Sequence, residues 1–143
     1  MAPLARILTI IGLTACASVP ASTPTVAPVP ATLAQIYYWR AKPGKLDEYS
    51  RYITGIAERI DGEAQRQGAF LSVTTYVSAD TASPWTHMRV FLLRDSTQLQ
   101  GLSAALDLAG TVIEPDSVKR RERSTYSATL RDRVGSAVVQ VIH

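Results

Sequence analysis

The stretch from Ile36 to Gly68, IYYWRAKPGKLDEYSRYITGIAERIDGEAQRQG, decides the fold of this chain. Its aromatic beginning favours a β-strand over residues 35–41, and the Pro43-Gly44 pair ends that strand. From Lys45 onward, apolar residues recur every three or four positions, which predicts a helix that ends near Gly68. The stripe that this helix should bury consists of Leu46, Tyr49, Ile53, Ile56, Ile60 and Ala64.

Carboxylates of the predicted helix form two pairs, Asp47-Glu48 and Asp61-x-Glu63. Paired carboxylates are one arrangement that acid–base catalysis uses. Because both pairs lie off the apolar stripe, however, we expect them on the outer face of the helix, in contact with water.

A hairpin and a second helix follow. Alternating residues predict strands over 70–78 and 85–93, joined through the turn-prone residues 79–84. Asp95, with Gln98 three residues later, is typical of a helix N-terminus, and the apolar stripe behind it ends at Gly110.

The C-terminal part departs from this regular alternation. A third helical stretch is expected from Pro115 or Asp116 to about Arg133, and Gly135 should end it. Residues 137–142 are apolar on nearly both faces and predict the last strand.

The resulting order is strand, helix, strand, strand, helix, extra helix, strand. Two β-α-β halves joined by a hairpin describe an α+β, ferredoxin-like arrangement, an antiparallel sheet with helices on one face. Strict alternation places Trp85, Phe91 and Leu93 on one side of their strand. Since two helical stripes cover only one face of the sheet, we expect this apolar side to stay uncovered and to mediate a sheet-to-sheet homodimer.

The opening YWRAKPGKLDEY, residues 38–49, and the order of the elements resemble the dimeric α/β-barrel superfamily. The resemblance covers about Gln35 to His143. It implies a dimeric barrel and a ligand held between the helices and the sheet or inside the barrel, without implying any one reaction. The additional helix at 115–133 departs from the minimal pattern of that superfamily.

The N-terminal segment has the layout of an export signal. One positive charge at Arg6 precedes an apolar core, and residues 13–16, LTAC, resemble the lipobox of bacterial lipoproteins. That resemblance implies cleavage before Cys16 and lipidation of its thiol, and Ala17 in the next position implies delivery to the outer membrane. We therefore expect a signal peptide over 1–15, a Pro/Ala/Thr-rich tether over 16–32 and one folded domain over 33–143.

Two other interpretations of the leader stay open. Ordinary signal-peptidase cleavage after the small residues around Cys16 would release a soluble secreted protein, and a buried apolar helix with an incidental cysteine is the third possibility. The segment is too short to span a bilayer, which needs about 20 apolar residues. The uncharged tether behind Cys16 favours the lipid anchor.

Composition excludes several classes of function. The net charge of +3 is small and spread along 143 residues, so no nucleic-acid surface is expected. Two histidines and one cysteine make a metal site improbable as well, and we expect neither a metal nor another cofactor. No glycine-rich phosphate loop and no nucleophile elbow occur.

His87 and Arg89 are the candidate catalytic residues that remain. They lie on one predicted strand face between Trp85 and Phe91, where an imidazole and a guanidinium could bind or polarise a planar anion. Alternatively, His87 is a hydrogen-bonded structural residue and Arg89 pairs with a carboxylate across the dimer. Further ligand-binding candidates, which depend on the sheet register, are Tyr38, Arg40, Trp39 and Tyr76.

A basic run, KRRER at 119–123, is either a patch for an anionic substrate or lipid head group or, more simply, a solvated helix face. We expect a lipid-anchored cell-envelope protein that binds a small molecule or an envelope partner. The alternative is a cofactor-independent oxygenase or isomerase on a planar or aromatic substrate, with His87 as acid/base and Arg89 holding charge.

Overall fold

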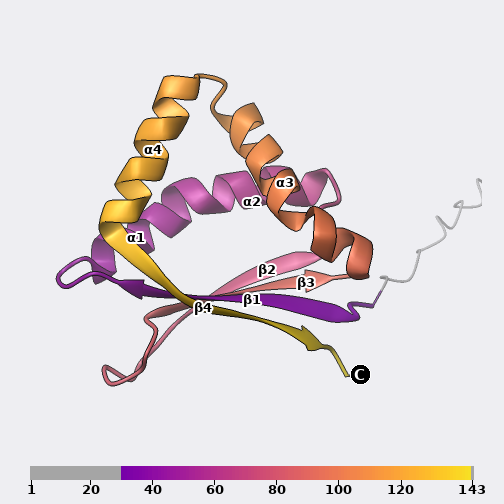
Figure 1. Cartoon of the computed structure of the whole chain (residues 1–143), viewed down its shortest axis with the longest axis horizontal. Helices are drawn as coiled ribbons and strands as arrows, with labels where there is room; N and C mark the ends of the chain where they lie inside the picture. The colour runs from indigo at the N-terminus through magenta and orange to yellow at the C-terminus, as the bar shows by residue number, and fades with distance from the viewer. Residues whose placement is uncertain (1–29, 143) are drawn as a thin grey trace, which may run out of the picture.

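The computed structural model of this protein describes residues 30–142 (Figure 1). The expected signal peptide, the expected lipidation site Cys16, most of the expected tether and His143 lie outside the described residues. Within 30–142, no helix is both long and apolar enough to cross a membrane.

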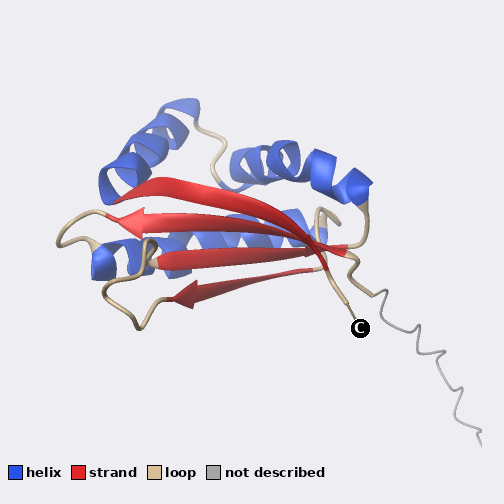
Figure 2. Ribbon diagram, turned by 60° about the horizontal axis from the view of Figure 1, so that its bottom comes forward, coloured by secondary structure: helices blue, strands red, loops and turns tan. Residues whose placement is uncertain are grey.

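A four-stranded antiparallel sheet forms one layer of the domain, in the strand order β2-β3-β1-β4. The strands are β1 (Leu33–Ala41), β2 (Ser72–Val77), β3 (His87–Leu93) and β4 (Arg131–Gln140). Figure 2 shows the helices on one face of the sheet and the other face open. The predicted α+β class with an antiparallel sheet is confirmed, and the arrangement is consistent with a ferredoxin-like fold.

The first helical rod contains a π-helical turn. It consists of α1 (Leu46–Tyr52), the π segment η1 (Ile53–Ala57) and α2 (Glu58–Arg66). Because a π turn holds about one residue more than an α turn, the residues behind it are rotated by roughly 100°. Asp61 consequently lies in the interior, 4% exposed, and the prediction that it faces water is wrong. Leu46, expected in the buried stripe, is 44% exposed.

The core occupies the space between the helices and the sheet. Its larger cluster connects α2 and the helix Ser96–Ile113 to β3. It consists of Ala64, Phe70, Phe91, Leu93, Leu102 and Ala109. A smaller cluster at the other end consists of Tyr49, Ile53 and Leu130. Gly68, with φ +81°, ends the first rod as predicted, since only glycine adopts this conformation without strain.

Two further helices complete the layer. Asp95 caps α3 (Ser96–Ile113) by accepting hydrogen bonds from the N–H groups of Thr97 and Gln98, as predicted. The helix continues past Gly110, so the predicted end there is wrong. Asp116 caps α4 (Ser117–Leu130) in the same way, and α3 and α4 form an inverted V above the sheet (Figure 1).

The last strand begins earlier than the sequence pattern indicates. α4 ends at Leu130, and β4 starts at once with Arg131. Gly135 therefore does not end a helix. It lies inside β4, opposite Tyr38 of β1. Residues 131–136 are mostly charged or polar and show no alternation of apolar and polar residues, so the sequence pattern does not predict a strand there. The pairing of this segment with β1 depends on tertiary contacts instead.

The two faces of the sheet are reversed relative to the prediction. Phe91 and Leu93 are 1% and 0% exposed under the helices. The open face instead carries the alternate residues of β3, Met88, Val90 and Leu92, together with Ile36 and Tyr38 of β1. This face remains apolar, so a cover for it is still expected.

Candidate functional site

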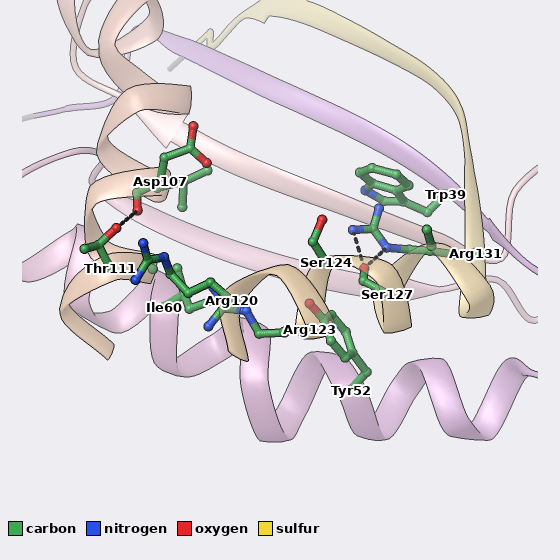
Figure 3. Close-up of a pocket in the computed structure, with 13 residues that line it drawn as sticks. Trp39, Tyr52, Ile60, Asp107, Thr111, Arg120, Arg123, Ser124, Ser127 and Arg131 are labelled. Carbon is green, nitrogen blue, oxygen red and sulfur yellow. Dashed lines mark hydrogen bonds between the residues drawn. The ribbon is translucent and has the colours of Figure 1, made fainter. Parts of the chain in front are cut away.

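A cleft of about 620 Å³ opens between the sheet, the first helical rod and the V of α3 and α4. Its volume lies in the range of about 300–1,000 Å³ that small-molecule sites occupy. Every layer of the domain contributes to its walls (Figure 3). The lining residues are Trp39, Tyr52, Ile60, Leu106, Asp107, Gly110, Thr111, Arg120, Arg123, Ser124, Ser127, Ala128 and Arg131.

A β-bulge aims two arginines at the helix side of the sheet. The pairing of β1 with β4 shifts by one residue between Tyr38 and Trp39, which leaves Val134 as the extra residue. Beyond the bulge, Arg133 and Arg131 lie opposite Trp39 and Ala41. An unbroken ladder would have put Val134 and Asp132 in these positions, because side chains alternate strictly along a strand.

Arg131 is the most firmly held of the lining side chains. Its Cζ lies 3.4 Å from the centre of the Trp39 ring and 5.4 Å from that of Tyr49. Its Nε and Nη2 donate to the Ser127 hydroxyl at 3.2 and 3.0 Å. Burial lowers the pKa of Arg131 from its ordinary value, yet a guanidinium stays protonated in proteins. One wall of the cleft is therefore a fixed positive charge stacked on an indole.

Two more arginines come from α4. Arg120 uses Nη1 to bind the carbonyls of Glu114 and Pro115, at 2.9 and 2.6 Å, and so secures the link between α3 and α4. Arg123, one turn further on, reaches across to α3. A Cβ at position 110 would lie 3.2 Å from its Nη2, so Gly110 leaves the room that this guanidinium occupies.

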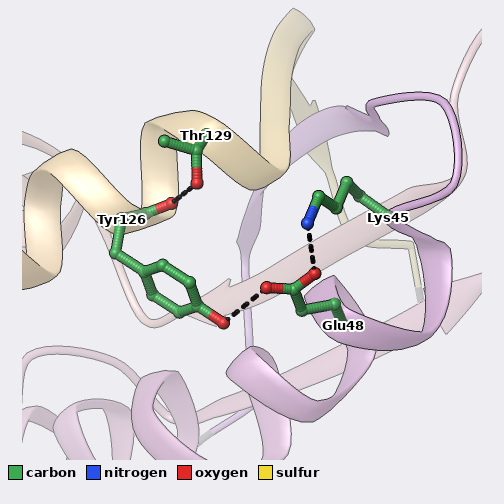
Figure 4. A network of polar contacts seen from close by, with 4 residues as sticks. All are labelled: Lys45, Glu48, Tyr126 and Thr129. Carbon is green, nitrogen blue, oxygen red and sulfur yellow. Dashed lines mark hydrogen bonds and ion pairs between the residues drawn. The ribbon is translucent and has the colours of Figure 1, made fainter.

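A polar chain fastens α4 to α1 next to the cleft (Figure 4). The hydroxyl of Tyr126 donates to Glu48 at 2.9 Å, and Nζ of Lys45 donates to the same carboxylate at 2.6 Å. The hydrogen bond from Lys45 is the main reason why the pKa of Glu48 is lowered. Tyr126 also meets Tyr52 edge-on, with ring centres 6.0 Å apart. These contacts set the position of the helix that carries Arg120 and Arg123.

His87, the predicted acid/base, lies outside the cleft and is 0% exposed. Nε2 is 3.1 Å from the Ser50 hydroxyl, and Nδ1 is 2.9 Å from the Thr86 hydroxyl. The centre of the Tyr49 ring lies 4.4 Å from the centre of the imidazole. Because Ser50 donates its own proton to the Leu46 carbonyl, it accepts from Nε2–H of a neutral imidazole. Burial also lowers the pKa of His87. These contacts fit a structural histidine.

Arg89 also lies under the helices, where it forms an ion pair with Asp61 of α2. The side chains are 14% and 5% exposed, and Nε of Arg89 is buried without a hydrogen-bond partner among the described residues. Burial raises the pKa of Asp61, an effect that the neighbouring guanidinium opposes. The expected carboxylate partner exists, but within the same chain.

The other predicted ligand-binding residues are divided between the two faces. Phe91 belongs to the core, whereas Trp85 contacts Tyr38 of the open face at 6.1 Å between ring centres. Tyr76 pairs with Met88 on that open face. Arg40 donates to the carbonyls of Ser83 and Pro84 and so holds the link between β2 and β3. The structure does not bring these residues together as one site.

Sequence reasoning did not identify the arginines and aromatics of the cleft as a set. Trp39 was a lining candidate, and the basic run at 119–123 contained Arg120 and Arg123, but its simpler interpretation was a solvated face. The sequence pattern predicts that Arg131 lies within a helix, whereas it is the first residue of β4. The missing signal is the bulge, for which Gly135, next to Val134, is a sequence cue. The sequence pattern instead assigns Gly135 to the end of a helix.

The fold and this cleft define a small α+β domain with a ligand-sized site between its sheet and its helices. The sequence matches no known family model and no curated protein. HapK from Hahella chejuensis has a similar structure, with a TM-score of 0.51 and 9% identity over 77% of this chain and 92% of that protein. PA3566 from Pseudomonas aeruginosa gives a TM-score of 0.45 and 12% identity over 82% of this chain and 98% of that one. At such identities the likeness to HapK concerns the fold alone.

Proposed function

We propose that this protein binds a small molecule in the cleft between its sheet and its helices. The observation that carries the proposal is the lining itself. A stacked Trp39–Arg131 pair forms one wall, and two further arginines face it from α4. Ligand sites combine such apolar surface with a few convergent polar groups.

Binding is favoured over catalysis by the position of the titratable groups. The cleft contains one carboxylate, Asp107, and its arginines do not act as acids or bases at neutral pH. His87, on which the oxygenase or isomerase alternative depends, is enclosed by Ser50, Thr86 and Tyr49.

The assembly that we propose is a homodimer of the dimeric α/β-barrel type, in which two open sheet faces cover each other. The apolar residues of that face support it, since an exposed apolar patch usually marks an interface. We further propose export to the cell envelope, with a lipid on Cys16 and delivery to the outer membrane. The LTAC sequence and the uncharged segment behind it support this address.

Mass spectrometry of the native protein, with and without heat release of bound compounds, tests the proposal of a ligand in the cleft. We expect a compound that co-purifies with the protein and is lost in a Trp39→Leu variant. Trp85→Leu is the matched control, because Trp85 lies by the open sheet face and away from the cleft. Retention of the compound by Trp39→Leu, or its loss only in Trp85→Leu, would place binding elsewhere.

A further inference from the structure

The charge of the cleft is unbalanced. Three arginines line it against one aspartate. The four ion pairs formed by residues 30–142 involve none of these three arginines. The lining therefore has an excess of positive charge, which favours an anionic ligand.

Among the arginines of the cleft, Arg123 is the one whose guanidinium donors are free to bind a ligand. Among the described residues it has no hydrogen bond and no ion pair, although it is half-buried. Gly110 leaves space for its end on one side. A second, smaller cleft of about 270 Å³ also has Arg123 in its lining, together with Arg59, Lys119 and one carboxylate, Glu114. Among residues 30–142 neither Asp107, Glu114 nor another carboxylate forms an ion pair with this guanidinium, so its natural partner is an anion from outside.

Arg131 supplies the second element of recognition. Trp39 and Ser127 fix its plane, and its Nη1 has no hydrogen-bond partner among residues 30–142. A guanidinium held flat offers both an edge that donates hydrogen bonds and a face on which a planar group can stack. Together with the ring of Tyr52, this favours a flat ligand over a compact ion.

We propose that the ligand is a planar molecule that carries a carboxylate or a phosphate. Arg123 and Arg120 hold the anionic group, and the planar part lies against the Trp39–Arg131 stack. This inference rests on the proposed function and adds the chemical class of the ligand. A phospholipid head group offers the same anionic chemistry as a free metabolite, so the test includes both sources.

Isothermal titration of the purified protein with naphthalene carboxylate and with its neutral carboxamide compares the affinities of a charged and an uncharged probe of similar shape. The difference measures the contribution of the negative charge to binding. We expect the carboxylate to bind about tenfold to a hundredfold more tightly, the usual range for a hydrogen-bonded charge. Arg123→Gln should reduce this preference, because the carboxylate then loses one of its two guanidinium partners. Arg121→Gln is the control, since Arg121 is an exposed residue of the same helix and lines neither cleft.

The outcomes separate this inference from the proposed function. Equal affinity for the two probes, or an unchanged preference in Arg123→Gln, overturns the anionic class while the cleft remains a binding site. Failure of both probes, with the native protein free of any bound compound, overturns the proposed function itself.

A competition experiment with lipid vesicles distinguishes a lipid head group from a free small molecule as the source of the anion. Competition between phosphatidylglycerol vesicles and the bound carboxylate supports a lipid head group, and the lack of it supports a free small molecule. Arg123-dependent binding to these vesicles without any binding of the carboxylate overturns the planar ligand in favour of a membrane surface.

Discussion

The guanidinium of Arg89 on β3 donates a hydrogen bond to the carboxylate of Asp61 on α2, and both side chains are almost fully enclosed. The pair exists because the π turn at 53–57 rotates Asp61 from the outer face of the helix to the inner one. It connects the first rod to the centre of the sheet, beside Phe91, whose ring lies 5.1 Å from the guanidinium carbon.

Asp61→Ala should lower the free energy of unfolding by about 3–5 kcal/mol, because removal of one partner leaves the other charge buried and unpaired. Urea unfolding followed by circular dichroism measures the change. Glu58→Ala is the control, since Glu58 is exposed on the same helix and should cost no more than about 0.5 kcal/mol.

The double variant Asp61→Leu/Arg89→Met should be clearly more stable than Asp61→Ala, because both charges are replaced by apolar groups. A loss equal to the sum of the two single losses would contradict a coupled buried pair.

Acid should destabilise the protein through His87. Its pKa is lowered by burial in the folded state, whereas an unfolded histidine titrates near about 6.5. As the pH falls below that value, the unfolded chain takes up a proton that the folded chain refuses, so the free energy of unfolding decreases. At higher pH this contribution is fully present and constant.

A His87→Gln variant should have a flatter dependence of unfolding free energy on pH between about 7 and 5. The other ionisable groups are the same in both proteins, so their effects cancel in the comparison. Identical slopes for the variant and the unmodified protein would show that His87 is protonated inside the fold.

The open sheet face should mediate the homodimer. Val90 lies on that face between Met88 and Leu92, and a charge there would be buried by a second sheet. We expect Val90→Glu to sediment as a monomer at concentrations at which the unmodified protein is a dimer. Val118→Glu on α4, where the side chain is 61% exposed, is the control and should stay dimeric. A monomeric unmodified protein would remove the barrel proposal.

Cys16 is expected to carry the lipid. Cys16→Ala should leave the chain unprocessed and without incorporated fatty acid, as labelling with radioactive palmitate in cells would show. Release of a processed, unlabelled protein into the medium would instead support ordinary signal-peptidase cleavage.

Much of the fold could be predicted from local pattern. The strand over 35–41, the Pro43-Gly44 turn, the capping by Asp95 and the stop at Gly68 depend on short-range chemistry, and each is found where it was expected. Periodicity failed where the backbone is irregular. The π turn and the bulge at Val134 each shift the phase by one residue, and a shift of one residue changes which face a side chain occupies.

The sequence by itself determined an α+β chain with an antiparallel sheet, because hydrophobic periods and turn residues act over a few neighbours. Only the tertiary structure decided which sheet face the helices cover, where β4 begins and which charges meet. Asp61 and Arg89, or Arg131 and Trp39, are far apart along the chain, and their contacts depend on packing against other elements. The candidate site was therefore hidden in residues that individually resemble an ordinary surface.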